Sequence, residues 1–181
     1  MPGLAVNVAV IHKDKVLLTK REDLEIWILP SGGVEDDESI AQAAIRETKE
    51  ETGLDVELTR LVGIYSRLGN MFPVHAVLFV AKPIGGEIKC QEGETIAVEW
   101  FAFDEIPSPL SAGHKKRIEN AISSISGMVV LQEINVPSFP EKLTRKELIE
   151  LRDGSGLARQ EFYLQMIEQA ELKEKIELRG E

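Results

Sequence analysis

The stretch GGVEDDESIAQAAIRETKEETGL, over residues 32–54, is the most informative part of this 181-residue sequence. Within it, Ser39 is followed three residues later by Gln42, a pattern typical of a capping box at a helix N-terminus. Good helix formers follow, and Gly53 is the residue type that most often ends a helix. The sequence therefore predicts one helix of about four turns over residues 39–52.

This predicted helix carries three glutamates on one face. Positions i, i+3 and i+4 of a helix lie side by side, so Glu47, Glu50 and Glu51 stand together. Their repulsion destabilises an isolated helix by roughly a few tenths of a kcal/mol per pair, and hard divalent cations that bind the clustered oxygens would offset it. From these residues alone, a metal site and a solvated acidic surface are both open. The other face is small or apolar and suits packing on a sheet: Ala41, Ala44, Ile45, Thr48 and Thr52.

The full spacing of charged and glycine residues in this stretch resembles the Nudix box. The matching positions are Gly32, Glu38, Arg46-Glu47, Glu50-Glu51 and Gly53-Leu54. The one departure is Thr48, where the family has a bulky aliphatic residue. Because that position packs beneath the helix, Thr48 puts local packing in doubt more than chemistry. The resemblance extends over roughly residues 4–125.

The resemblance implies a fold, a reaction and a cofactor. The expected fold is an α/β/α sandwich with a mixed sheet, and the expected reaction is hydrolysis of a phosphoanhydride in a nucleoside diphosphate linked to another group, X. Glu47, Glu50 and Glu51 would bind Mg²⁺, for which Mn²⁺ can substitute. A backbone carbonyl of Ser31 or Gly32 would complete the metal site.

The resemblance also suggests roles for residues around the metals. Arg46 resembles the arginine that holds the carboxylates in place through Glu38 or a glutamate of the pair, and it counts with Glu50 among the expected catalytic residues. An additional acidic ligand or base commonly comes from the loop before a tryptophan-containing strand. Glu94 suits that place and Glu92 is its rival. Glu51 is the expected general base.

Three residues are candidates for contact with the substrate. Arg21 ends a predicted strand that points toward the box, where it would meet a phosphate or remain a surface arginine. Trp27 and Tyr65 could stack on a nucleobase, and for both the competing interpretation is packing in the core. His75 lies inside an apolar run and reads as a strand histidine rather than a catalyst.

Outside the box, alternating small and β-branched residues predict a hairpin over residues 5–19. Further segments predicted as strands are residues 26–29, 56–67, 74–81 and 97–103, and residues 114–125 are predicted to form a second helix. We expect a Nudix domain over residues 1–127 and a mostly helical C-terminal extension over residues 128–181.

The extension contains a second capping-box pattern, formed by Thr144 and Glu147. After the glycine-rich break at residues 153–156, we expect a longer helix over residues 157–178. Its apolar residues recur at helical spacing and would pack on the chain's own core or mediate a homodimer: Phe162, Tyr163, Met166, Ile167 and Ala170.

Composition limits the possible partners and location. The formal net charge is −10, which argues against duplex nucleic acid bound through a broad basic face. A small nucleotide can still bind where metal ions reverse the local charge. No run approaches the ~18 apolar residues of a membrane span, and the N-terminus lacks a secretory signal. We therefore expect a cytoplasmic protein with no membrane partner.

Three classes of function remain open to test. The first is the hydrolase. The second is a Nudix-like regulatory domain that senses a nucleotide without cleaving it, although such a domain would be expected to lose metal carboxylates that are all present here. The third is a scaffold whose C-terminal helices bind a protein partner, which deletion of residues 141–181 would test.

Overall fold

The computed structural model describes residues 2–139 and 143–180. Its helices are α1 (Ile40–Thr52), α2 (His114–Ile122), α3 (Arg145–Ser155) and α4 (Arg159–Glu168). Its strands are β1 (Gly3–His12), β2 (Lys15–Arg21), β3 (Trp27–Ile28), β4 (Ser31–Gly33), β5 (Leu54–Gly69), β6 (Val74–Gly86), β7 (Thr95–Ala102), β8 (Met128–Asn135) and β9 (Glu171–Leu178). Within the described residues, no helix is long and apolar enough to span a membrane.

The strands form a mixed sheet in the order β3-β2-β1-β6-β5-β8-β9, with β4 paired to β1 and β7 to β2. The pairs β1/β6 and β5/β8 are parallel, and the other pairs are antiparallel. The predicted hairpin is confirmed, since His12 pairs with Lys15 across its turn. The predicted mixed α/β fold is confirmed as well.

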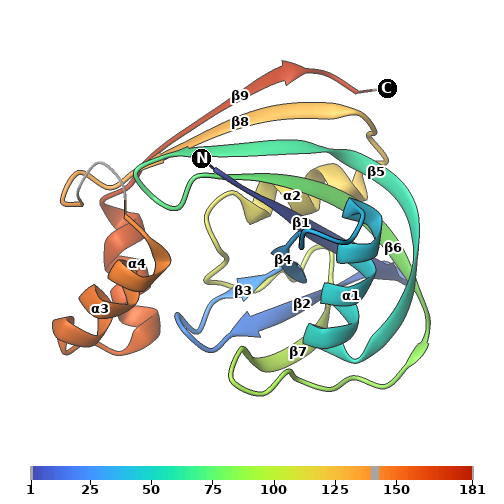
Figure 1. The fold of residues 1–181 in the computed structure, drawn as a ribbon, viewed down its shortest axis with the longest axis horizontal. Coiled ribbons are helices and arrows are strands. Elements are labelled where there is room, and N and C mark those ends of the chain that lie inside the picture. The colour runs from blue at the N-terminus through green and yellow to red at the C-terminus, as the bar shows by residue number, and fades with distance from the viewer. Residues whose placement is uncertain (1, 140–142, 181) are drawn as a thin grey trace.

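Helices cover both faces of the sheet around β1. Val6, Val8 and Val10 belong to the apolar cluster that includes α1 residues, whereas Ala9 belongs to the cluster that includes Ile118 of α2. Because side chains alternate across a strand, α1 and α2 lie on opposite faces (Figure 1). A strand covered on both sides reads as a continuous apolar run, which explains the sequence of β1.

The C-terminal segment differs from expectation. Residues 157–178 do not form one helix, because α4 ends at Glu168 and residues 171–178 form β9, which pairs with β8. The expected boundary at residue 127 falls between α2 and β8, and β8 continues the sheet by pairing with β5.

The apolar stripe of α4 packs on the chain's own core. Phe162, Tyr163 and Met166 are buried in one cluster with Leu24 and Ile28 from the N-terminal half, and Ile167 and Ala170 are partly buried against it. Figure 1 shows α3 and α4 beside the ends of β3 and β5. The apolar stripe of α4 is therefore covered by the chain's own core. It is not a free surface that could mediate a homodimer.

Candidate active site

The first element of the candidate site is α1, whose ends follow the sequence signals. Ser39 and Gln42 exchange side-chain to backbone hydrogen bonds in a capping box, and Gly53 ends the helix with a φ of 75°, in the left-handed region that favours glycine. The buried positions of the helix are Ala43, Ala44, Thr48, Glu51 and Thr52.

The packing face of α1 corrects two expectations. Ala41 and Ile45 are exposed, and Ala43 is buried instead. Thr48, the departure from the family pattern, is fully buried and its hydroxyl donates to the carbonyl of Ala44 at 2.8 Å. Its polar atom is therefore satisfied, and the helix packs on the sheet without the bulky aliphatic residue.

Glu51 is the most buried carboxylate of the site. Its Oε2 accepts hydrogen bonds from the backbone N–H of Ser31 at 3.1 Å and from the hydroxyl of Thr19 at 3.4 Å. Burial raises the pKa of Glu51 to about 8; the charges of Glu47 and Glu94 raise it too, whereas the Ser31 N–H and the Arg21 charge act in the opposite direction. Burial and the neighbouring negative charges thus favour the neutral form of Glu51 unless a cation binds beside it.

Arg46 holds the other carboxylates together. Its guanidinium makes two hydrogen bonds to Glu38, of 3.0 and 2.5 Å, and its Nη1 donates to Glu47 at 2.8 Å and to Glu50 at 3.0 Å. Its Nη2 also donates to the carbonyl of Gly33 at 3.1 Å. The Arg46 hydrogen bonds lower the pKa of Glu38. One residue therefore ties the helix, the loop before it and β4 into a single unit.

These residues surround a polar pocket of about 330 Å³, called here the carboxylate pocket. It is lined by Arg21, Ser31, Gly32, Gly33, Glu35, Arg46, Glu47, Glu50, Glu51, Gln91, Glu94 and Arg145. Gly32 is required sterically, because a Cβ there would lie 1.9 Å from Cδ of Glu47. The backbone of β4 can therefore approach the glutamates closely.

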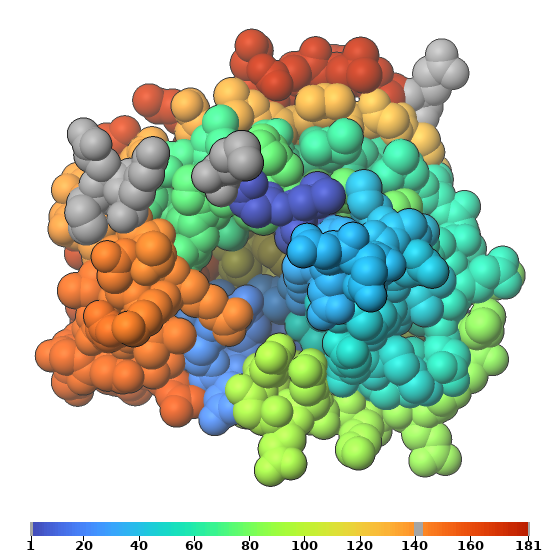
Figure 2. Space-filling view, in the orientation of Figure 1, coloured from blue at the N-terminus to red at the C-terminus, as the bar shows by residue number. Residues whose placement is uncertain are grey.

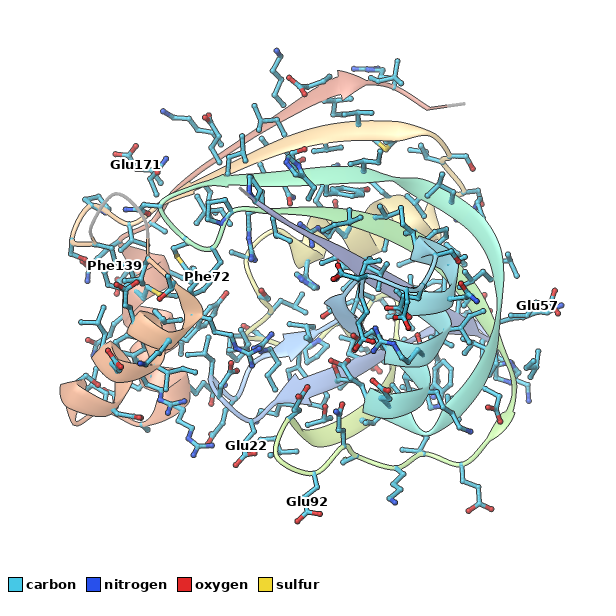
Figure 3. The ribbon with its side chains drawn as sticks, viewed as in Figure 1. Glu22, Glu57, Phe72, Glu92, Phe139 and Glu171 are labelled. Carbon is cyan, nitrogen blue, oxygen red and sulfur yellow. The ribbon has the colours of Figure 1, made fainter. Side chains whose placement is uncertain are left out.

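The loop before β7 supplies one further carboxylate. Glu94 lines the carboxylate pocket, and its backbone carbonyl accepts a hydrogen bond from the N–H of Glu22 at 2.8 Å, which fixes the loop to the end of β2. Glu92 points away from the molecule (Figure 3). The structure thus brings Glu94, and not its rival Glu92, to the other carboxylates.

The donor set of the carboxylate pocket suits a hard divalent cation, because its acidic residues offer only oxygen ligands. Among the described residues, no three acidic, histidine or cysteine side chains are already at metal-binding spacing. Glu47 and Glu50 are bound to Arg46, at 2.8 and 3.0 Å, and would turn from it toward a bound cation. Five carboxylates line the pocket, and its arginines are already engaged by Glu38 and Asp23, so bound cations would balance the excess negative charge.

The structure corrects two of the substrate contacts expected from the sequence. Tyr65 is fully buried, and its hydroxyl accepts a hydrogen bond from Asn120 at 2.8 Å. Trp27 is 9% exposed and packs edge-on against Phe101. Both side chains belong to the core cluster on the α2 side of the sheet and are absent from the carboxylate pocket. Both aromatic side chains therefore pack in the core, which was the alternative to stacking on a nucleobase.

Arg21 does line the carboxylate pocket, but its guanidinium is bound to Asp23 at 2.9 and 2.5 Å. His75 contacts Ser66 in the neighbouring strand, at 2.9 Å, as expected for a strand histidine. Sequence reasoning missed Arg145. No local motif marks it, because it reaches the pocket only through the packing of α3.

Comparisons with known proteins identify relatives of this chain and of its fold. The family model described as the NUDIX domain matches residues 1–121. A putative 8-oxo-dGTP diphosphatase of Bacillus subtilis is 31% identical over 116 residues, which cover 64% of this chain and 76% of that protein. An ADP-ribose pyrophosphatase of Methanocaldococcus jannaschii is 36% identical over 125 residues, which cover 66% of this chain and 72% of that protein. The crystal structure of an ADP-ribose pyrophosphatase from Streptococcus suis matches with a TM-score of 0.60 and 32% identity, over 68% of this chain and 92% of that one.

Proposed function

The chain belongs to the NUDIX family of hydrolases, and on that premise we propose that it is a metal-dependent enzyme that cleaves a phosphoanhydride bond in a nucleoside diphosphate linked to another group. The observation that carries this proposal is the convergence of Glu47, Glu50, Glu51 and Glu94 on one polar pocket beside the backbone of β4. Relatives that act on nucleotide derivatives support the substrate class.

We propose Mg²⁺ as the cofactor, with Mn²⁺ able to substitute. Glu47, Glu50 and Glu51 would hold it, together with a backbone carbonyl of Ser31 or Gly32, and Glu94 would serve as an additional ligand or as a base. A divalent cation held there would supply positive charge against the phosphoryl oxygens and make the attacking water more acidic.

The chain's own residues orient the reacting groups. Arg46 binds Glu38, Glu47 and Glu50, so it sets the positions from which Glu47 and Glu50 would turn toward a bound cation. Glu51 is the candidate general base, because its carboxylate lines the pocket and is held in place by the Ser31 N–H and the Thr19 hydroxyl. Arg21 borders the pocket and would contact a phosphate oxygen.

A phosphate-release screen over nucleoside diphosphate derivatives, with Mg²⁺ or Mn²⁺, tests this function. We expect metal-dependent turnover in the wild type and a loss of about 100-fold or more in Glu50→Gln. Equal turnover in both proteins would contradict the mechanism. A wild type that binds nucleotides but cleaves none of them would support the sensor domain instead.

A further inference from the structure

A second pocket adjoins the carboxylate pocket, and the C-terminal helices form part of its wall. We call it the arginine pocket. Its volume is about 170 Å³, and it is lined by Arg21, Asp23, Leu24, Arg67, Met71, Phe72, Ser111, Ala112, Ile134, Arg145, Leu148 and Tyr163. Arg21 and Arg145 border both pockets. Figure 2 shows this face of the molecule hollowed between the orange C-terminal helices and the blue surface of α1.

The arginine pocket has an excess of positive charge. Asp23 accepts hydrogen bonds from Arg21 and, at 3.0 Å, from Arg145, so one carboxylate serves two guanidinium groups. The third, Arg67, has no carboxylate partner within residues 2–139 and 143–180. Its Nη2 donates to the carbonyl of Phe72 at 3.2 Å, and its Nε is buried without a hydrogen-bond partner there. An anion in the pocket would supply the negative partner that the Arg67 guanidinium lacks.

The size and remaining walls of the arginine pocket limit what can enter. Pockets for drug-sized ligands have volumes of about 300–1,000 Å³, so 170 Å³ admits one end of a substrate and not a whole nucleoside. Met71, Phe72 and Tyr163 contribute apolar walls, and the Tyr163 hydroxyl already bonds to Ala112 and Leu110. Phe72 lies between the end of β5 and the C-terminal helices (Figure 3).

We infer that the arginine pocket binds a phosphate monoester that is separate from the diphosphate being cleaved. This inference rests on the proposed function and narrows it: the preferred substrate carries a third phosphate, on the group X or on the nucleoside ribose. Arg67 and Arg145 would bind that phosphate, while the diphosphate lies over the adjoining carboxylates. Arg67 lies within the family match, whereas Arg145, Leu148 and Tyr163 lie beyond residue 121, where that match ends, so this chain's C-terminal segment completes the pocket.

Titration calorimetry with inorganic phosphate, in the absence of divalent cations, tests binding apart from catalysis. Without cations the carboxylate pocket repels phosphate, so the arginine pocket should dominate. We expect Arg67→Met to weaken binding by roughly 10- to 100-fold, because it removes charge-assisted hydrogen bonds at nearly constant volume. Lys146→Met is the matched control, since Lys146 follows Arg145, is 88% exposed and forms an ion pair with Glu150 at 3.8 Å. An equal loss in the control would overturn the inference.

A kinetic comparison tests the same inference during turnover. Three substrates are compared: a nucleoside diphosphate derivative, its analogue phosphorylated on X and its analogue phosphorylated on the ribose. We expect one phosphorylated analogue to exceed the parent in kcat/KM by roughly 10- to 100-fold in the wild type, and this ratio to approach one in Arg67→Met and in Arg145→Met. Arg145 is 60% exposed, so its variant keeps the test valid if Arg67→Met fails to fold.

The two experiments separate failure of the inference from failure of the function. A wild type that hydrolyses all three substrates equally and does not bind phosphate would overturn the inference that the arginine pocket binds phosphate. The proposed hydrolase activity would still hold. Phosphate binding that depends on Arg67, in a protein without hydrolysis, would overturn the proposed function and keep the anion site.

Discussion

The backbone N–H of Ser31 donates a hydrogen bond of 3.1 Å to Oε2 of Glu51, and this contact joins β4 to the carboxylate helix. The same oxygen accepts from the hydroxyl of Thr19 on β2. Glu51 is therefore fixed by two strands as well as by its own helix. The position of the β4 backbone and the position of the proposed base depend on each other.

Glu51→Gln separates the charge of this residue from its hydrogen bonding. Glutamine can still accept from Ser31, but it cannot act as a base or as an anionic ligand. We expect kcat/KM with Mg²⁺ to fall by about 100-fold or more. Without divalent cations, we expect the thermal midpoint at pH 8.5 to stay equal or rise, because burial disfavours the charged form of Glu51.

The matched control for Glu51→Gln is Glu57→Gln. Glu57 pairs with Lys82 on the surface and points away from the carboxylate pocket (Figure 3). Activity in that variant should match the wild type. Retention of full activity in Glu51→Gln would remove Glu51 from the mechanism.

Glu94 and Glu92 form a natural pair for testing the loop before β7. Glu94 lines the carboxylate pocket, whereas Glu92 points into solvent. We expect Glu94→Gln to lower kcat by roughly 10-fold or more, and Glu92→Gln to leave it within about twofold. Initial rates at saturating substrate and Mg²⁺ measure both. If the two variants behave alike, Glu94 has no special part in catalysis.

Arg46→Lys tests whether geometry, and not only charge, organises the metal ligands. Lysine keeps the positive charge but cannot make two parallel hydrogen bonds to Glu38 while also reaching Glu47 and Glu50. We expect the Mg²⁺ concentration for half-maximal activity to rise by roughly 10- to 100-fold. Lys49→Gln, on the same helix, should leave it unchanged. An unaltered Mg²⁺ dependence in Arg46→Lys would show that charge suffices.

The parts of the fold that the sequence predicts well depend on local signals. The α1 boundaries come from Ser39, Gln42 and Gly53, and their hydrogen bonds and backbone angle form within a few residues. The carboxylate face follows from helix geometry alone, so Glu47, Glu50 and Glu51 could be grouped without a structure. Glu94 needed the resemblance, because its approach to the helix depends on the pairing of β2 with β7.

The parts that the sequence predicts poorly depend on distant partners. Residues 171–178 alternate apolar and charged side chains weakly, and they become β9 because β8 offers a free edge, where Ile134 pairs with Leu172. Arg67 and Arg145 share a pocket only after α3 packs against the end of β5. Tyr65 and Trp27 carry aromatic rings that suit stacking or core packing equally, and burial by α2 decides between them.

The C-terminal helices should be part of the stable core and not a removable appendage. Met166 is 4% exposed in a cluster with Leu24 and Ile28. We expect Met166→Ala to lower the free energy of unfolding by about 2–5 kcal/mol, and Leu164→Ala, at a half-exposed position of the same helix, by far less. Urea denaturation measures both. Equal, small effects would show that α4 packs loosely and that residues 141–181 can be deleted without loss of the core.

His114 should make stability depend on pH. Its Nδ1 accepts a hydrogen bond of 3.1 Å from the N–H of Leu29, which requires a neutral ring. Burial, with the charges of Arg117 and Arg67, lowers the pKa of His114 well below 6.5. The unfolded chain therefore binds the proton more tightly, so the contribution of His114 to stability should be constant above about pH 7 and fall as pH drops through 6.5, by up to about 1.4 kcal/mol per unit.

Urea denaturation between pH 5.5 and 7.5 checks this dependence in a Glu51→Gln parent, because Glu51, with a pKa of about 8, would otherwise add a slope of opposite sign in this range. His114→Asn retains a hydrogen-bond acceptor but cannot titrate, so its unfolding free energy should vary less with pH than that of the parent. His12→Asn, at an exposed position, should keep the parent's slope. The same slope in His114→Asn would assign the dependence to another group. A smaller slope would mean that protonation of His114 opposes the hydrogen bond that holds Leu29, two residues before Ser31 in the site.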